Sequence, residues 1–152
     1  MSAMQASGSG AVYRAPMRSR RDDVDFGATI ERALSRRLCG FGGRREPSDE
    51  RLMRRIERFR DVDDGSFVWT RDPDGLYWLG RINGRYFYDD DDDASAVDLV
   101  HVRRCDWLST PLPEHAVPAA VIATFRRGGR NFQQTHHPSV GAESLRVWRN
   151  LA

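Results

Sequence analysis

The sequence contains no lysine, since all 24 of its Lys+Arg residues are arginine. This absence excludes sites that need a lysine amine: the P-loop of nucleotide hydrolases, Schiff-base enzymes and the common nuclease site whose motif ends in lysine. The sequence also lacks a Gly-x-Ser-x-Gly nucleophile motif, the zinc motif of the base deaminases and a glycine-rich phosphate loop. We therefore expect a protein that is not an enzyme.

Cysteine is scarce, and long apolar runs are absent. Cys39 and Cys105 are too few for a disulfide scaffold and form no CxxC pair, which favours a reducing cytoplasm. Together with His101, His136 and His137 they lack the paired spacing of a structural zinc site, so we expect no metal and no cofactor. No segment approaches the ~18 apolar residues of a membrane span, and none has the pattern of a signal peptide, so we expect no membrane partner.

What the sequence does contain is segregated charge. The chain of 152 residues is long enough for one domain and has a net charge of +2. Residues 1–60 carry 14 arginines against 8 acids, residues 61–93 carry 3 arginines against 10 aspartates, and residues 94–152 carry 7 arginines against 4 acids. Because arginine suits phosphate and guanine edges, two basic segments around an acidic one favour nucleic-acid binding and a location at the nucleoid.

Two helices are predicted in the N-terminal part. Residues 1–22 have little apolar periodicity, which predicts a disordered basic arm. Residues 23–62 form a helical region, with helices at 25–38 and 48–60 separated by a flexible joint of glycine and arginine. The second helix carries arginines around its apolar stripe, at Arg51, Arg54, Arg55 and Arg58. We interpret them as the solvated face of an amphipathic helix, and the alternative is a helix that lies on phosphate.

Period-2 patterns and turn signals predict a sheet in residues 63–152. The expected elements are strands at 66–71, 76–82 and 85–88 as a three-stranded meander, a solvated acidic loop at 89–93, a strand at 97–105, a helix at 118–125, a strand at 131–136 and a helix at 139–151. This order predicts an α+β fold with a small curved, barrel-like sheet flanked by helices, and with the helical region as an N-terminal extension.

Aromatic residues are concentrated in this sheet. Of the fifteen in the chain, eight lie between Phe67 and Trp107. Strand periodicity places them on both faces of the sheet, although a single apolar face would not need rings on both sides. Some of them are therefore expected to line a pocket, where rings can hold an unstacked base.

The order of these strand motifs resembles that of the PUA-like superfamily. The motifs are Phe67-Val-Trp-Thr-Arg71, Gly75-Leu-Tyr-Trp-Leu-Gly-Arg-Ile-Asn-Gly84, Tyr86-Phe-Tyr88 and His101-Val-Arg-Arg-Cys-Asp-Trp107. The nearest branch is that of the EVE/ASCH-type domains of modification-dependent restriction systems, and in particular the stand-alone actinobacterial proteins that bind 5-methylcytosine DNA. The resemblance implies a small β-barrel that flips a modified base of double-stranded DNA into an aromatic pocket.

The resemblance also implies which residues would form the site. The base pocket would be walled by Trp69 and Trp107, with Tyr77 or Tyr88 as a third wall, and Thr70 and Asp106 lie beside these rings in the sequence. The candidates for contact with the nucleic-acid strands are Arg71, Arg103, Arg126, Arg127, Arg130, Asn131, Gln133 and Gln134.

Three other functions remain open at this stage. The first is an RNA-binding PUA-like module that acts in RNA modification or translation. The second is an enzyme, either a base glycosylase or a hydrolase that uses Asp106. The third is a protein-interaction module whose contact is the helix at 48–60.

Overall fold

The computed structural model describes residues 10–44, 46 and 48–152. Its strands are β1 (Val12–Arg14), β2 (Leu38–Phe41), β3 (Phe67–Arg71), β4 (Tyr77–Ile82), β5 (Phe87–Tyr88), β6 (His101–Trp107) and β7 (Gln133–Gln134). Its helices are α2 (Phe26–Arg36), α3 (Glu50–Arg60), α4 (Asp92–Ala96), α5 (Ala119–Arg126) and α6 (Val140–Leu151), with a 3-10 turn at Glu114–Ala116.

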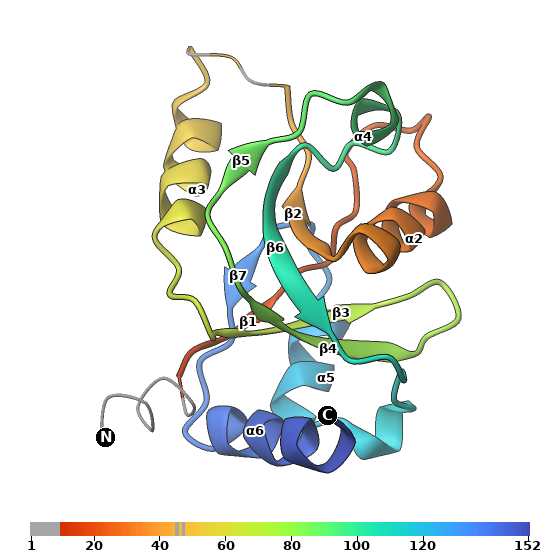
Figure 1. The fold of residues 1–152 in the computed structure, drawn as a ribbon, viewed down its shortest axis with the longest axis vertical. Helices are drawn as coiled ribbons and strands as arrows, with labels where there is room; N and C mark the ends of the chain where they lie inside the picture. Colours follow the sequence, from red (N-terminus) through yellow and green to blue (C-terminus); the bar gives the residue numbers. More distant parts are fainter. Residues whose placement is uncertain (1–9, 45, 47) are drawn as a thin grey trace.

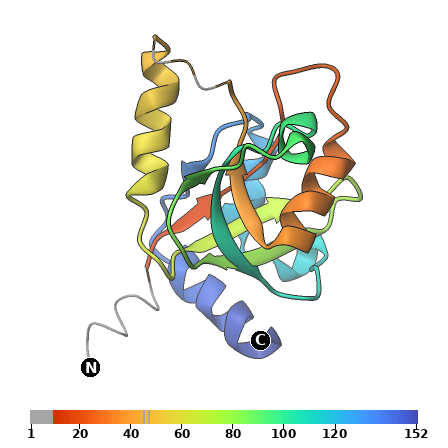
Figure 2. The ribbon, with the colours of Figure 1, turned by 45° about the horizontal axis from the view of Figure 1, so that its top comes forward.

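The strands form one strongly curled sheet with helices around it (Figures 1 and 2). Its strand order is β2-β6-β4-β3-β1-β7, and β5 pairs with β6 outside this path. The α+β class with a small curved sheet and flanking helices is therefore confirmed.

The segment before the first helix belongs to the sheet. β1 pairs in parallel with β3 and antiparallel with β7, so it connects two strands that are distant in the sequence. Val12, Ala15 and Met17 are buried next to these strands. The prediction of a disordered arm is therefore wrong for residues 10–22, because three apolar side chains are too few to show periodicity but enough to anchor a strand. Residues 1–9 lie outside the described residues.

Both N-terminal helices are confirmed, but the segment between them is not a joint. Asp25 and Asp49 cap α2 and α3 by accepting backbone N–H groups. Between the helices, β2 is buried along its whole length and pairs with β6. A Cβ at Gly40 would lie 1.8 Å from the carbonyl oxygen of His101, so this glycine permits close strand approach instead of flexibility. Because β2 lies within the sheet, residues 23–62 are not a separate helical extension.

The predicted hairpin of β3 and β4 is confirmed, whereas the predicted meander is not. The register of the hairpin pairs Trp69 with Leu79. The other edge of β4 is occupied by β6, with Gly80 opposite Trp107. β5 therefore pairs with the far half of β6, where Phe87 lies opposite Val102.

The acidic run does not form an extended loop. Asp91 accepts the N–H of Asp93 at 2.8 Å and caps α4, and aspartates in the first turn interact favourably with the helix dipole. Asp89 pairs with Arg32 at 3.0 Å, and Ala94 of α4 is fully buried. Local capping and one ion pair thus offset the like-charge repulsion from which an extended run was expected.

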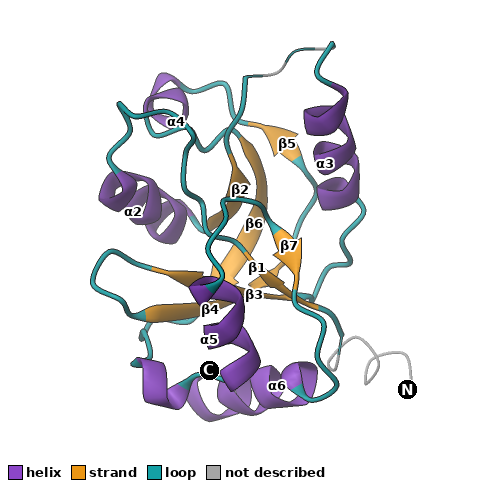
Figure 3. Ribbon diagram, turned by 180° about the vertical axis from the view of Figure 1, so that it is seen from behind, coloured by secondary structure: helices purple, strands orange, loops and turns teal. Residues whose placement is uncertain are grey.

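The C-terminal elements follow the predicted order. α5 and α6 cover one end of the sheet, as the view from behind shows (Figure 3), and β7 lies between them in the sequence and pairs with β1. In the part of the chain that the structure describes, no helix is long and apolar enough to cross a membrane.

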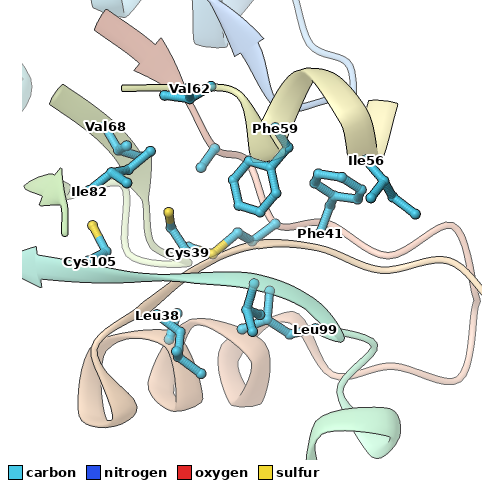
Figure 4. Close-up of a cluster of buried hydrophobic side chains, with 14 of the residues drawn as sticks. Leu38, Cys39, Phe41, Ile56, Phe59, Val62, Val68, Ile82, Leu99 and Cys105 are labelled. Atoms are coloured by element: carbon cyan, nitrogen blue, oxygen red, sulfur yellow. The ribbon is translucent and has the colours of Figure 1, made fainter. Parts of the chain in front are cut away.

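Alternating residues of the strands supply two apolar clusters, one on each side of the sheet. The first cluster joins Val68, Ile82 and Cys105 to α2 and α3, with Phe59 and Phe41 in contact below α3 (Figure 4). The second cluster packs alternate side chains of β1, β3 and β4 against α5 and α6; it includes Val12, Phe67, Trp69, Tyr77, Leu79, Val121, Ile122 and Val140. The division of the sheet aromatics between two faces is therefore confirmed.

Candidate nucleic-acid interface

A cavity of about 560 Å³ opens at the edge of the first apolar cluster, between α3, the end of β2, the segment after β1 and the chain around β7. Its volume lies within the range of small-ligand sites in proteins. We call it the first cavity; it is lined by Tyr13, Arg18, Ser19, Arg20, Phe41, Gly42, Gly43, Arg55, Arg58, Phe59, Asp61, Val62, Asp98, Arg130, Asn131, Phe132, Gln133, Gln134 and His136.

Four aromatic rings in mutual contact form one wall of the first cavity. Tyr13 and Phe132 stack with their centroids 5.0 Å apart and their planes at 15°. Phe132 meets Phe59 edge-on at 4.8 Å, and Phe59 meets Phe41 at 5.1 Å. Phe59 and Phe41 belong to the core, whereas Tyr13 and Phe132 are half-buried. The cavity therefore offers partly exposed aromatic rings on a rigid base.

Arginines from three separate segments surround these rings. Arg20 and Arg55 both donate to the same amide oxygen, Asn131 Oδ1, at 3.1 and 3.3 Å. Burial lowers the pKa of Arg55 below its ordinary value, the charges of Arg20 and Arg58 lower it further, and Asp49 raises it. Several positive charges thus converge on one neutral amide.

Arg55 retains unused hydrogen-bonding capacity. Its Nε is buried and has no hydrogen-bond partner among the residues that the structure describes. A buried donor without a partner costs free energy, and like charges held together add to that cost. An anion bound beside Arg55 and Arg20 would offset the repulsion between their like charges, so the arrangement favours a negatively charged ligand.

One carboxylate of the cavity lining, that of Asp98, is engaged in hydrogen bonds with other residues. Asp98 accepts hydrogen bonds from the hydroxyl of Ser19 and, at 3.1 Å, from the N–H of Gly43. These bonds tie the segment after β1 to the end of β2. Asp98 therefore builds the rim of the cavity, and its charge is already stabilised by two donors.

The rim at β2 is held by a buried histidine. The Nε2 of His101 lies 2.7 Å from the carbonyl oxygen of Gly43, and its Nδ1 lies 2.9 Å from the Tyr86 hydroxyl. Because a carbonyl only accepts, Nε2 is the nitrogen that carries the proton toward Gly43. A Cβ at Gly42 would lie 2.2 Å from the Asp98 carboxyl carbon, so the loop requires glycine there.

The structure does not bring the predicted base-pocket rings together. Trp69 and Tyr77 are 0% and 1% exposed in the second apolar cluster. Trp69 Nε1 donates to the hydroxyl of Ser144 at 3.0 Å, and the Tyr77 ring packs edge-on against Phe125. Thr70 is buried as well and donates to the carbonyl of Ala15 at 2.7 Å. Trp69 and Tyr77 are covered by α5 and α6, and Thr70 is buried elsewhere in the sheet, so none of the three has an open face for a base.

The other predicted pocket residues lie apart from these and from one another. Trp107 is half-buried against the first cluster and donates to the carbonyl of Leu38 at 3.0 Å. Tyr88 is exposed on β5, with its ring 5.5 Å from that of His101. Asp106 is exposed and accepts from Asn83 at 3.2 Å. Side chains alternate along a strand, and cross-strand partners share a face. Trp69 pairs with Leu79 and shares its face with Tyr77, whereas Trp107 pairs with Gly80 and lies on the other face.

Four of the predicted polar contacts do meet in the first cavity, because Arg130, Asn131, Gln133 and Gln134 all line it. Arg71 lies at a second, smaller cavity. Arg126 and Arg127 point elsewhere: Arg126 pairs with Glu114 at 2.6 Å, and Arg127 donates to Thr124.

Arg103 has a structural role instead of the predicted contact with a strand. It is 4% exposed and donates to the carbonyls of Phe59, Val62 and Gly84 and to the carboxylate of Asp64. Carbonyls at a helix C-terminus lack intrahelical donors, and this guanidinium supplies them at the end of α3. Arg14 acts in the same way at the end of α5, where it donates to the carbonyls of Thr124 and Gly128.

Sequence reasoning missed most of the cavity's other residues. Tyr13, Arg18 and Arg20 fall in the predicted disordered arm and Phe41 in the predicted joint. Arg55, Arg58 and Phe59 fall on the predicted helix at 48–60, and Phe132 and His136 in the predicted strand at 131–136. The available signal was the helix at 48–60 with arginines on its polar face, combined with the arginine-, glycine- and amide-rich loop at 126–134. The sequence does not show that the helix at 48–60 and the loop at 126–134 lie side by side, and only this proximity distinguishes a site from a solvated helix face.

Comparison of the sequence with known protein families and with curated proteins finds no match.

Proposed function

We propose that this protein binds DNA without catalysis and takes one unstacked base, most readily 5-methylcytosine, into the first cavity. The observation that carries the proposal is the cavity itself, in which half-buried Tyr13 and Phe132 lie next to converging arginines and side-chain amides. Stacking on an aromatic side chain contributes ~1 to 3 kcal/mol per base, and arginines bind the flanking phosphates.

The amide side chains support recognition of a base edge. Asn131, Gln133 and Gln134 line the first cavity together with Phe132. Gln133 and Gln134 offer both donor and acceptor groups, whereas Asn131 offers its NH₂ donors because its oxygen accepts from Arg20 and Arg55. The cytosine edge presents a donor and acceptors that such amides can pair with. The choice of 5-methylcytosine rests on the resemblance of the strand motifs to those of 5-methylcytosine readers. Burial of the methyl group is worth ~0.8 kcal/mol, or about fourfold in affinity.

The decisive experiment is a fluorescence titration of one duplex in three forms: unmodified, with 5-methylcytosine and with 6-methyladenine. We expect the methylcytosine duplex to bind about fourfold more tightly than the unmodified one. Affinity for all three should fall with salt as phosphate contacts release counterions. Equal affinity for the three duplexes would contradict base recognition. Tighter binding of a single-stranded RNA of the same sequence would show that RNA, and not DNA, is the ligand.

Two matched pairs of variants locate the site. Phe132→Ala should lower affinity about tenfold, whereas Phe87→Ala, which removes a 40% exposed ring on β5 outside the cavity, should leave it unchanged. Arg55→Gln should lower affinity about tenfold and reduce the salt dependence by about one phosphate contact, whereas Arg54→Gln on the exposed face of the same helix should not. Equal effects within either pair would show that binding occurs elsewhere.

A further inference from the structure

A second cavity of about 280 Å³ lies beside the first. It is lined by Pro16, Phe26, Phe125, Arg71 and the glycines at 128 and 129, together with two arginines. These two, Arg18 and Arg130, also line the first cavity. These two side chains therefore form the boundary between the two cavities, which we call the Arg18–Arg130 ridge. A ligand that extends across this ridge occupies both cavities.

The second cavity combines apolar walls with positive charge. Pro16, Phe26 and Phe125 supply the walls, and none of the described residues that line it is acidic. The guanidinium of Arg18 lies 3.9 Å from the centre of the Phe26 ring, which holds it flat on that ring. Arg71 approaches from the end of β3, with its guanidinium 5.8 Å from the Tyr77 ring. The cavity thus has the composition expected of a site for a sugar and its phosphate.

The loop that closes the second cavity is rigidly supported. Gly128 and Gly129 have φ values of +78° and +95°, a conformation that favours glycine. Arg14 lies beneath this loop and donates to the Gly128 carbonyl at 2.6 Å, and a Cβ at Gly129 would come 2.8 Å from Arg14 Nη2. The buried arginine therefore fixes the loop from one side, and a Cβ at Gly128 would meet no atom within 4 Å, so space remains beside the loop.

We propose that the second cavity binds the next sugar-phosphate of the same strand, so that the protein reads one base and grips the backbone on one side of it. This inference rests on the proposed function, since the strand is the one whose base occupies the first cavity. The phosphate between the two nucleotides lies on the Arg18–Arg130 ridge, and the following phosphate lies at Arg71. Because the second cavity lies on one side of the first, the grip has a single strand polarity.

The test combines Arg71→Gln with duplexes in which single phosphates are made neutral. Each duplex carries one 5-methylcytosine and one methylphosphonate linkage, placed at the first or second position on its 5′ or 3′ side. On one side only, we expect the second linkage to lower affinity about tenfold, and Arg71→Gln to lower it equally. Arg71→Gln combined with this methylphosphonate should lower affinity no more than either change alone, because both remove the same contact. Arg85→Gln, an exposed arginine that lines neither cavity, is the control.

The outcomes separate this inference from the proposed function. If Arg55→Gln weakens binding but Arg71→Gln does not, the second cavity is not a backbone site and the inference fails while the proposed function stands. If the effect of Arg71→Gln adds to that of every methylphosphonate, Arg71 acts through general charge and the inference also fails. If the wild-type protein binds none of the duplexes, the proposed function itself is overturned.

Discussion

Under α5 and α6, Trp69 and Tyr77 are sealed from solvent, whereas at the edge of the opposite side Tyr13 and Phe132 remain half-exposed in a cavity. The helices explain the difference. α5 and α6 pack directly against the sheet and cover its rings. α3 buries Phe59 but presents Arg55 at the first cavity, where Arg55 donates to Asn131 of the loop instead of packing an apolar side chain on the rings.

The same comparison applies to arginine. Arg103 is buried and saturated, since several backbone carbonyls and a carboxylate accept its donors. Arg55 is half-buried, shares one amide oxygen with Arg20 and has an unpaired Nε among the described residues. Arg103 therefore stabilises the fold, whereas Arg55 lines the first cavity among like charges and is available to a ligand.

The largest expected effect tests whether the sealed aromatic side is purely structural. Trp69→Ala removes a fully buried indole and should lower the free energy of unfolding by ~3 to 5 kcal/mol, through lost transfer free energy and a residual cavity. Urea unfolding measures this loss. Affinity for the methylcytosine duplex should not change at a temperature where the variant stays folded. A loss of DNA affinity in the folded variant would show that Trp69 takes part in binding.

The next largest effect distinguishes the buried Arg103 from Arg55 of the first cavity by their contributions to stability. Arg103→Met leaves buried carbonyls at the end of α3 without donors, and should lower the free energy of unfolding by about 3 kcal/mol. Arg55→Met removes one of several like charges and should change stability by less than ~0.5 kcal/mol while weakening DNA binding. If the two variants lowered the free energy of unfolding equally, Arg55 would have a structural role like that of Arg103.

Alkaline pH probes the buried groups. Burial is the main cause that raises the pKa of Tyr77, Tyr13 and Cys105 above their ordinary values. The fold therefore favours their neutral forms, and the unfolded chain loses these protons first as pH rises. Stability is complete below the unfolded cysteine value of about 8.5 and should fall above it, by ~1.4 kcal/mol per pH unit for each group that titrates.

Urea unfolding between pH 7 and pH 10.5 measures this alkaline decline. Tyr77→Phe and Cys105→Ala should each make it shallower, because each removes a group that ionises only on unfolding. A decline that neither variant alters would show that other groups cause it.

The smallest expected effect concerns the contact that orients Trp69. Ser144→Ala removes the hydroxyl that accepts from the indole N–H, and should cost about 1 kcal/mol of stability with no change in DNA affinity. The measurement is again urea unfolding together with the duplex titration. If affinity fell, the sealed side and the cavity would be coupled through the sheet.

Local patterns in the sequence predicted many of the elements. The apolar stripes of α2 and α3 and the turn between β3 and β4 act over a few residues, so they can be read directly. β1, β2 and the pairing of β5 could not be read in this way. Their pairings join residues that are distant in the sequence, and their segments are short or rich in glycine.

The candidate site was predictable in part for the same reason. The stretch from Arg130 to Gln134 was recognised because arginine, amides and glycines stand together in the chain. Its partners Tyr13, Arg20 and Arg55 were not, since they come from two other segments that the fold brings to Asn131 and Phe132. The aromatic residues of β3 and β4 had the right chemistry for a base pocket, but the helices that cover them lie beyond any local pattern.

By itself, the sequence determined the α+β class, the two N-terminal helices, the β3–β4 hairpin and a surface that carries its positive charge entirely on arginine. These follow from short-range backbone preferences and from composition. The tertiary structure decided which rings are sealed and which are open, which arginines are saturated by carbonyls and which face one another, and where the cavities lie. Those properties depend on long-range packing, because a side chain's exposure and partners are set by whichever distant segment covers it.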